Sequence, residues 1–207
     1  MIIEIRLLLK SIAVVLFIET AASIMITAVK WPYLPVLALV RLLEIISLIV
    51  LITRRDSGLA VIGLGRKEWR SGLKRGIIWS AFFGLSALLG YFILQLFHVS
   101  PWPLIRTTLP QETLSRVLFF MAGGLIAPVA EEIFFRGIIY GFLRRWGILT
   151  ALVGSTFMFV LLHGIAGGVP IVQIVGGIVF ALSYEIEKKL LVPMTIHILG
   201  NMAIFLL

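Results

Sequence analysis

Long apolar runs separated by short polar segments set the pattern of this chain. The runs lie at roughly 7–29, 33–53, 76–97, 113–145, 148–163, 170–186 and 190–207. About 20 consecutive apolar residues in a helix suffice to cross the hydrocarbon core of a bilayer. The pattern therefore predicts an all-α fold, a polytopic transmembrane helix bundle of about seven spans. We expect residues 1–207 to form a single membrane domain.

The fourth run, 113–145, is too long for one straight span. Gly123, Gly124 and Pro128 lie inside it, and proline removes a helical hydrogen-bond donor. These residues could break the run into two tilted or partly re-entrant pieces, which would raise the number of spans to eight.

Composition supports a membrane protein over a soluble one. The 207 residues are 60% hydrophobic and 14% charged, whereas soluble domains average about 45–50% and about 25%. The formal net charge is +8, but the basic residues stand in short segments between apolar runs, which indicates a topology signal and no nucleic-acid partner. The chain has no cysteine, so disulfides, thiolate nucleophiles and cysteine-ligated metals are excluded.

The distribution of the basic residues predicts an orientation. Segment 54–75 is the richest in Lys and Arg, and the positive-inside rule makes it cytoplasmic. Counting seven spans from there puts the N-terminus, the pair Arg144 and Arg145, and the pair Lys188 and Lys189 on the same side, with mainly Lys30 and Arg106 opposite. The compact chain without a targeting extension leads us to expect a prokaryotic cytoplasmic (inner) membrane.

Charged residues inside apolar runs are the candidates for chemistry, because each costs about 2.5–3.5 kcal/mol near the bilayer centre. The stretch APVAEEIFFRGIIYGFLRR holds Glu131, Glu132 and Arg136. Glu132 and Arg136 are four residues apart, so on a helix they share a face and can pair. Glu131 points about 100° away from Glu132 and has no cation at a helical neighbour position. It is therefore free to face groups on other helices.

Two of the three histidines also lie in apolar runs. His163 follows Phe159 by one helical turn, and His197 precedes Asn201 by one turn. Together with Glu131 they could form a buried polar cluster among three helices. A neutral imidazole can relay a proton of water, and His and Asn side chains can donate hydrogen bonds to a developing oxyanion. A single such residue is more often a helix–helix contact, but their joint occurrence favours a functional site.

The remaining intramembrane charges have simpler interpretations. Arg41 and Glu44 are three residues apart in the second run and can satisfy each other. Glu19 has no local partner; a pair with another helix is one option, and its role stays open.

Missing motifs narrow the chemistry further. The sequence has no HExxH zinc motif. The only aspartate, Asp56, lies in a loop, and the residues around Ser155 lack the second glycine of a GxSxG elbow. What remains is acid–base chemistry of Glu and His acting on water.

Three motifs carry a resemblance to a known family. EEIFFR fits EExxxR, FVLLH fits FxxxH and HILGN fits HxxxN, in this order along the chain. Residues 113–207 thus resemble the CPBP family of glutamate-type intramembrane proteases, the CAAX prenyl proteases and bacteriocin-processing proteins also called the Abi family. The resemblance makes 113–207 the catalytic core helices and 1–112 the N-terminal spans with the basic loop.

The resemblance also implies roles for the motif residues. Glu131 would activate the attacking water, assisted by His163, while His197 and Asn201 would stabilise the oxyanion. Glu132 and Arg136 would orient the site, and Phe159 would shape it. The implied function is a cofactor-free intramembrane endopeptidase acting on a membrane-anchored or lipidated protein in the lipid bilayer.

Three alternatives remain open. One is a non-catalytic immunity or scaffold membrane protein of the same fold. Another is a zinc-dependent version of the protease, since two histidines and a glutamate are a set that could also bind zinc. A third, a proton-coupled transporter, is disfavoured because the sequence shows no inverted halves.

Overall fold

The computed structural model describes residues 3–55, 58–105, 107–163 and 170–207, and its described part contains helices and no strands. The first long helices are α1 (Ile5–Thr27), α2 (Tyr33–Thr53) and α3 (Trp69–Leu96), with the short η1 (Gly58–Ile62) and η2 (Arg66–Glu68) before α3 and α4 (Trp102–Ile105) after it. A long helical segment then runs through α5 (Thr113–Phe119), η3 (Phe120–Ile126), α6 (Ala127–Glu132), η4 (Ile133–Tyr140), α7 (Gly141–Leu143) and η5 (Arg144–Trp146). The chain ends with α8 (Ile148–Leu162), α9 (Ile171–Glu187) and α10 (Leu191–Leu206).

Each predicted span coincides with one of these helices or with the long helical segment, so the predicted helical bundle is confirmed. Within the described residues, four helices are long and apolar enough to cross a membrane: Ile5–Thr27, Tyr33–Thr53, Arg66–Leu96 and Thr113–Trp146. Helices α8 and α10 are apolar but shorter. The chain is an integral membrane protein.

The fourth run is not broken, in agreement with the count of seven spans. Segment Thr113–Trp146 is one continuous helix whose parts η3 and η4 are π-helical, so the alternative of eight spans is wrong. The N–H of Ala127 donates to Ala122, five residues earlier, directly before Pro128 at the start of α6. A π turn widens the helix, which lets the proline ring fit without a sharp kink.

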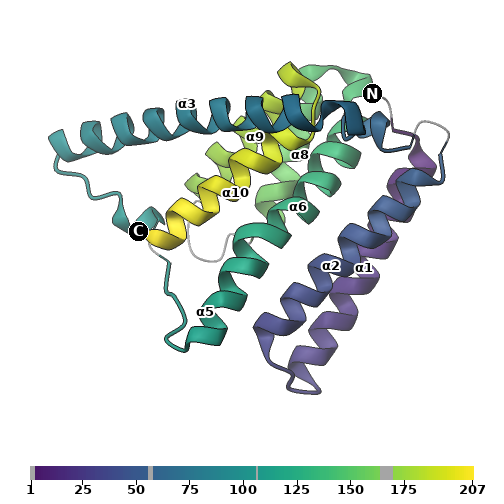
Figure 1. The fold of residues 1–207 in the computed structure, drawn as a ribbon, viewed down its shortest axis with the longest axis horizontal. Helices are drawn as coiled ribbons and strands as arrows, with labels where there is room; N and C mark the ends of the chain where they lie inside the picture. The colour runs from purple at the N-terminus through teal and green to yellow at the C-terminus, as the bar shows by residue number, and fades with distance from the viewer. Residues whose placement is uncertain (1–2, 56–57, 106, 164–169) are drawn as a thin grey trace.

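The helices form an open bundle in which α1 and α2 make an antiparallel hairpin on one side (Figure 1). Helix α3 packs mainly against α10 and runs at a wide angle to α1 and α2. Its 28 residues correspond to about 42 Å, longer than the roughly 30 Å hydrocarbon core, so a tilt suits its length. The centre of the bundle is η4, in which every residue is buried.

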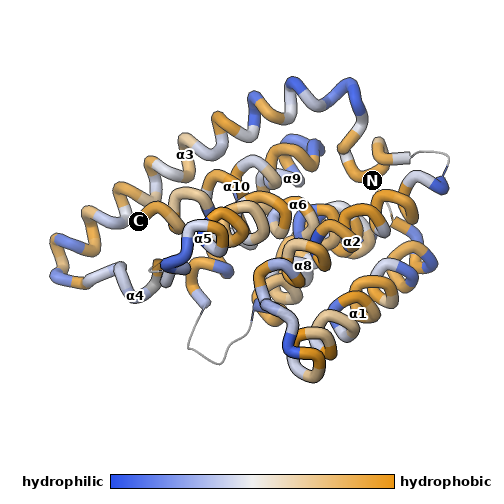
Figure 2. Tube along the Cα trace, turned by 60° about the horizontal axis from the view of Figure 1, so that its bottom comes forward, coloured by the Kyte–Doolittle hydropathy of each residue, from blue (hydrophilic) through white to orange (hydrophobic). Residues whose placement is uncertain are grey.

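Hydrophobic residues, orange in Figure 2, occur along all the long helices, and many of their side chains are exposed. On α3, Phe82, Leu85 and Leu96 are 68%, 64% and 79% exposed. A soluble protein would not leave such a surface in water. These faces contact lipid.

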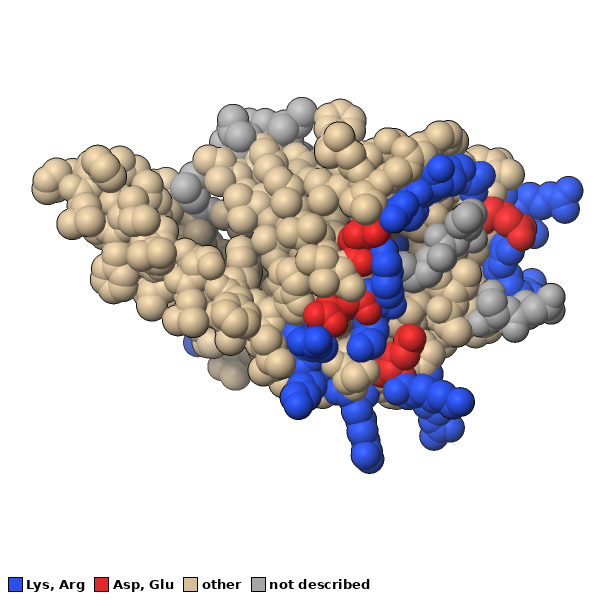
Figure 3. All heavy atoms as spheres, turned by 90° about the horizontal axis from the view of Figure 1, so that it is seen from above, with Lys and Arg blue, Asp and Glu red and all other residues tan. Residues whose placement is uncertain are grey.

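Lys and Arg side chains gather on one part of the surface when the molecule is seen from above (Figure 3). Glu185 binds Arg144 at 3.0 Å and Lys188 at 2.6 Å, and Arg75 lies 3.4 Å from Glu187. Segments that the count of spans put on one side of the membrane are therefore in contact. Arg106, which the count of spans put on the opposite side of the membrane, lies outside the described residues.

The close approach of the basic loop to the end of α9 depends on one glycine. Gly63 has a φ of +68°, and a Cβ at this position would lie 2.2 Å from the carbonyl oxygen of Lys188. The Gly63 carbonyl accepts a hydrogen bond from the N–H of Leu190 at 3.0 Å. The loop before α3 is thus tied by its backbone to the turn between α9 and α10.

Candidate active site

The motif residues come from three helices that meet around η4. Glu131 and Glu132 end α6, and Arg136 lies in η4. Phe159 lies in the last turn of α8 and His163 directly follows that helix. His197 and Asn201 lie in α10.

Glu132 binds Arg136 and His197 in a buried network of polar groups. Its Oε1 atom accepts hydrogen bonds from Nη1 of Arg136 at 2.9 Å and from Nδ1 of His197 at 2.9 Å. Arg136 also donates through Nη2 to the carbonyl of Gly177 at 3.2 Å. The local pair expected from the spacing is formed, and it joins the long helix to α9 and α10.

Aromatic rings surround the Arg136 guanidinium. Its Cζ atom lies 4.7 Å from the ring centroid of Phe159, 5.2 Å from that of Phe180 and 5.8 Å from that of Phe135. Rings at these distances stabilise a cation through their negative faces. Such a shell keeps water away and strengthens the Glu132–Arg136 interaction.

Glu131 faces the two histidines and forms no hydrogen bond with any of the described residues. Its Oε2 atom is buried and unpaired, 3.7 Å from Nε2 of His163 and 3.8 Å from Nε2 of His197. These separations exceed a direct hydrogen bond. A polar contact of this length suits a bridging water.

The contact that Nδ1 makes in each histidine shows which ring nitrogen carries the proton. Nδ1 of His163 lies 2.8 Å from the carbonyl oxygen of Phe159, and Nδ1 of His197 lies 2.9 Å from Glu132. A carbonyl or carboxylate oxygen only accepts, so each Nδ1 carries the proton. In the neutral ring, Nε2 is then a free acceptor that faces Glu131.

Asn201 lies one turn after His197 but is engaged elsewhere. Its Nδ2 atom donates to the carbonyl oxygen of Gly123 at 2.9 Å. A second N–H of the amide remains available. The structure therefore brings Glu131, His163 and His197 together, and it anchors Asn201 to the π-helical part of the long helix.

The sequence reasoning missed Phe180 and the Gly177 carbonyl of α9. The Phe180 ring stacks on His197 with centroids 4.5 Å apart and planes 20° apart. No motif marked Phe180, since an aromatic residue in an apolar run carries no signal of its own. Gly177 also lets α9 approach α8 closely, because a Cβ there would lie 2.8 Å from Cγ2 of Thr156 on α8.

Among the described residues, no group of three or more His, Asp and Glu side chains is arranged to hold a metal ion.

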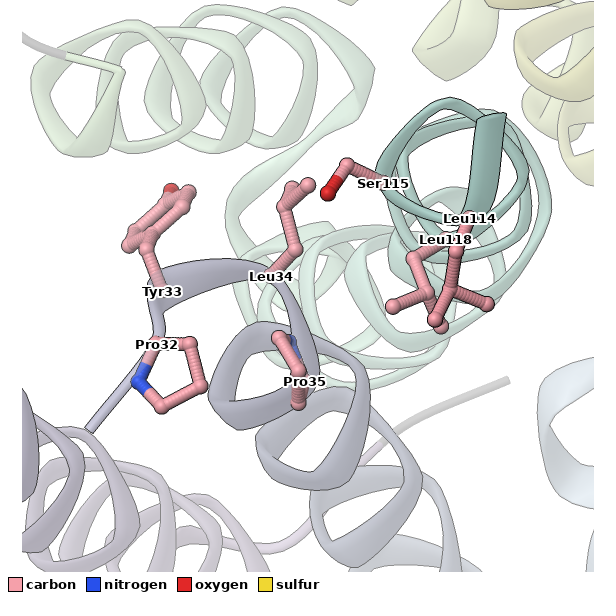
Figure 4. Close-up of a pocket in the computed structure, with 7 residues that line it drawn as sticks. All are labelled: Pro32, Tyr33, Leu34, Pro35, Leu114, Ser115 and Leu118. Atoms are coloured by element: carbon pink, nitrogen blue, oxygen red, sulfur yellow. The ribbon is translucent and has the colours of Figure 1, made fainter. Parts of the chain in front are cut away.

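A pocket lies away from the motif residues, between the starts of α2 and α5 (Figure 4). It is lined by Pro32, Tyr33, Leu34, Pro35, Leu114, Ser115 and Leu118.

Comparison with known proteins agrees with the geometry. Residues 113–203 match the family model described as type II CAAX prenyl endopeptidase Rce1-like. A curated relative, the membrane-embedded CAAX protease MroQ of Staphylococcus aureus (strain USA300), is 34% identical over 91 residues, which cover 41% of this chain and 36% of the relative. The match thus spans about a third of the relative's length. No solved structure matches the chain.

The family model covers all three motifs, and the residues of these motifs converge on one buried site. Residues 113–203 are therefore similar to the CAAX-type membrane proteases, as the three motifs predicted.

Proposed function

We propose that this protein is an intramembrane endopeptidase that hydrolyses a peptide bond of a membrane-anchored or lipidated protein. The observation that carries the proposal is the unpaired Oε2 atom of Glu131, buried between Nε2 of His163 and Nε2 of His197. A buried carboxylate without a partner is costly. A bound water would satisfy it and would stand where two bases can accept its protons.

In the proposed reaction, Glu131 and His163 hold a water and take its proton as the oxygen attacks the carbonyl carbon of the substrate. A carbon–oxygen bond forms, and the carbonyl oxygen becomes an oxyanion. The proton then passes to the leaving nitrogen as the carbon–nitrogen bond breaks, which releases an amine and a carboxylic acid. This use of one group as base and then as acid is ordinary for general acid–base catalysis.

His197 and the free N–H of Asn201 are the proposed oxyanion donors. Nε2 of His197 can donate only when the ring is doubly protonated, since Nδ1 already donates to Glu132. Positioned donors of this kind stabilise the charge that develops in the transition state.

We also propose that the basic end faces the cytoplasm and that the membrane is a prokaryotic inner membrane. Segment 54–75 and the ends of α7 and α9 carry their cations on the same surface. Because lipid-exposed helices surround the site, a substrate reaches it most readily from within or beside the bilayer. A membrane anchor or a lipid on the substrate would supply that access.

The test compares purified wild type with Glu131→Gln in detergent, supplied with candidate membrane-anchored proteins from the same cell. Mass spectrometry looks for a new terminus. Glu112→Gln is the matched control, because Glu112 precedes α5 and is exposed. We expect cleavage by wild type and by the control, and none by Glu131→Gln.

Other results would favour the alternatives. Loss of cleavage on adding a zinc chelator would support a metal-dependent reaction. No cleavage by any variant, with a cellular phenotype that survives Glu131→Gln, would support a non-catalytic scaffold.

A further inference from the structure

One aromatic ring outside the sequence motifs lies against a histidine of the candidate site. Phe180 of α9 is buried, and its ring stacks on the His197 imidazole with centroids 4.5 Å apart and planes 20° apart. Phe159 meets the same imidazole at a steep angle, with centroids 5.9 Å apart and planes 77° apart. Two rings, from α8 and α9, thus hold the imidazole from different directions.

The position of the Phe180 ring is determined by its own helix. A helical side chain leans toward the N-terminus and covers the turn before its own residue. That turn carries Gly176, where a Cβ would lie only 3.3 Å from Cε2 and from Cζ of Phe180. The ring therefore lies close over the backbone of α9, and Arg136 stands over it with Cζ 5.2 Å from the ring centroid. Phe180 is thus a firmly packed support for His197.

The hydrogen bond to Glu132 alone does not fix the plane of the His197 ring. Nδ1 lies 2.9 Å from Oε1 of Glu132, and rotation of an imidazole about its Cβ–Cγ bond has a broad energy profile. A ring held at one atom can pivot about that atom. Such a pivot carries Nε2 away from Glu131, whose Oε2 atom is 3.8 Å from it. A flat ring against the face of the imidazole opposes this movement.

We propose that Phe180 is a positioning residue that fixes the plane of the His197 imidazole, so that Nε2 faces the space beside Glu131. This inference rests on the proposed function, in which Nε2 of His197 donates to the oxyanion. Such a donor is effective only where its geometry is held to within about 0.5 Å. Phe180 acts through His197 and does not touch the substrate.

The first test compares the steady-state kinetics of wild type, Phe180→Leu and Phe180→Tyr on the identified substrate. Leucine fills much of the space without a flat face, so we expect Phe180→Leu to lower kcat by about 10–10²-fold. KM should stay within about twofold of wild type, because the lost interaction belongs to the transition state. Phe180→Tyr keeps the aromatic face and should hold kcat within about threefold of wild type.

Two other phenylalanines separate this role from general packing. Phe134 is also buried, and among the described residues its ring contacts no aromatic ring other than Phe135. Phe134→Leu should therefore lose stability and keep kcat near wild type. Phe135 lies beside Arg136 but contacts no histidine ring in the described part of the chain. Phe135→Leu therefore loosens the surroundings of Arg136 and should leave the plane of His197 unchanged.

A second measurement needs no substrate. Nitrogen NMR of protein with isotope-labelled histidine reports which ring nitrogen carries the proton, and His98→Gln and His163→Gln assign the signals. At a pH where the rings are neutral, His197 of wild type should show a protonated Nδ1 and an unprotonated Nε2. In Phe180→Leu the ring loses its single orientation, so both signals should move toward the average of the two tautomers. They should not move in Phe135→Leu.

A wild-type kcat in Phe180→Leu, or nitrogen signals that do not move, would overturn the inference. Equal losses of kcat in Phe180→Leu and Phe134→Leu would also overturn it, since both losses would then reflect packing. If Phe180→Leu does not fold, Phe180→Met takes its place, because the flexible thioether fills the space without a flat face. Absence of cleavage by wild type, with the expected nitrogen signals, would count against the proposed function alone.

Discussion

At the scale of single residues, two adjacent glutamates have opposite environments. Glu132 is completely buried and its Oε1 atom accepts two charge-assisted hydrogen bonds, whereas Glu131 accepts none from the described residues. The Oε2 atoms of both glutamates are buried without a hydrogen-bond partner there. Charge-assisted bonds are the stronger class of hydrogen bond. In the proposed function, Glu132 therefore holds the site together and Glu131 takes part in the reaction.

The two glutamates should respond differently to the same substitution. Glu132→Gln removes the charge that balances buried Arg136, so we expect a loss of about 3–5 kcal/mol in the free energy of unfolding. Glu131→Gln breaks no hydrogen bond and should leave stability within about 1 kcal/mol of wild type. Unfolding in mixed micelles measures both. Equal losses in the two variants would contradict this division of roles.

Asn201 should matter for rate more than for substrate binding. If its free N–H meets the oxyanion, Asn201→Ala should lower kcat by about 10²–10³-fold with little change in KM. Steady-state kinetics on the identified substrate checks this. A variant with wild-type kcat would show that the Asn201–Gly123 hydrogen bond is purely structural.

At the scale of helices, the site depends on how closely α8 and α9 approach the long helix. Gly177 lets α8 pack against α9 and exposes its own carbonyl to Arg136. The π-helical turns of η3 and η4 keep Thr113–Trp146 continuous while presenting Gly123 to Asn201. Backbone positions without functional groups thus decide where the functional ones lie.

Adding one methyl group at Gly177 tests this packing. The new Cβ would lie 2.8 Å from Cγ2 of Thr156, a side chain with little freedom to move, so we expect Gly177→Ala to cost about 1–3 kcal/mol. Gly84→Ala is the matched control, because nothing lies within 4 Å of a Cβ there. Combining Gly177→Ala with Thr156→Ser removes the clashing methyl and should recover much of the loss. Failure of that rescue would mean that the contact is not the cause.

At the scale of the whole molecule, charge and lipid exposure define an orientation. The basic segments meet at one end, held by Glu185 and Glu187, and the apolar faces of the helices surround the bundle. In the orientation proposed above, which follows the positive-inside rule, the basic end faces the cytoplasm.

The lack of native cysteines makes this orientation easy to test. Lys67→Cys lies at the basic end and Lys30→Cys precedes α2, and both lysines are exposed. In intact cells, a membrane-impermeant maleimide should label Lys30→Cys and leave Lys67→Cys unlabelled until the membrane is opened. The reverse pattern would place the basic end outside.

The sequence by itself determined the features that depend on neighbours along the chain. Apolar runs predicted the helices, the four-residue spacing predicted the Glu132–Arg136 pair, and three short motifs predicted the match to the family model. Each of these follows from helical periodicity or from residues within one turn.

Only the tertiary structure decided which helices lie side by side. It joined His197 to Glu132, stacked Phe180 on His197 and paired Glu19 with Arg41. Some of these partners are far apart in the chain, and all lie on different helices, so no local period relates them. It also showed that 113–146 is one continuous helix with π-helical turns before and after α6, since a proline in an apolar run does not by itself fix whether the helix continues.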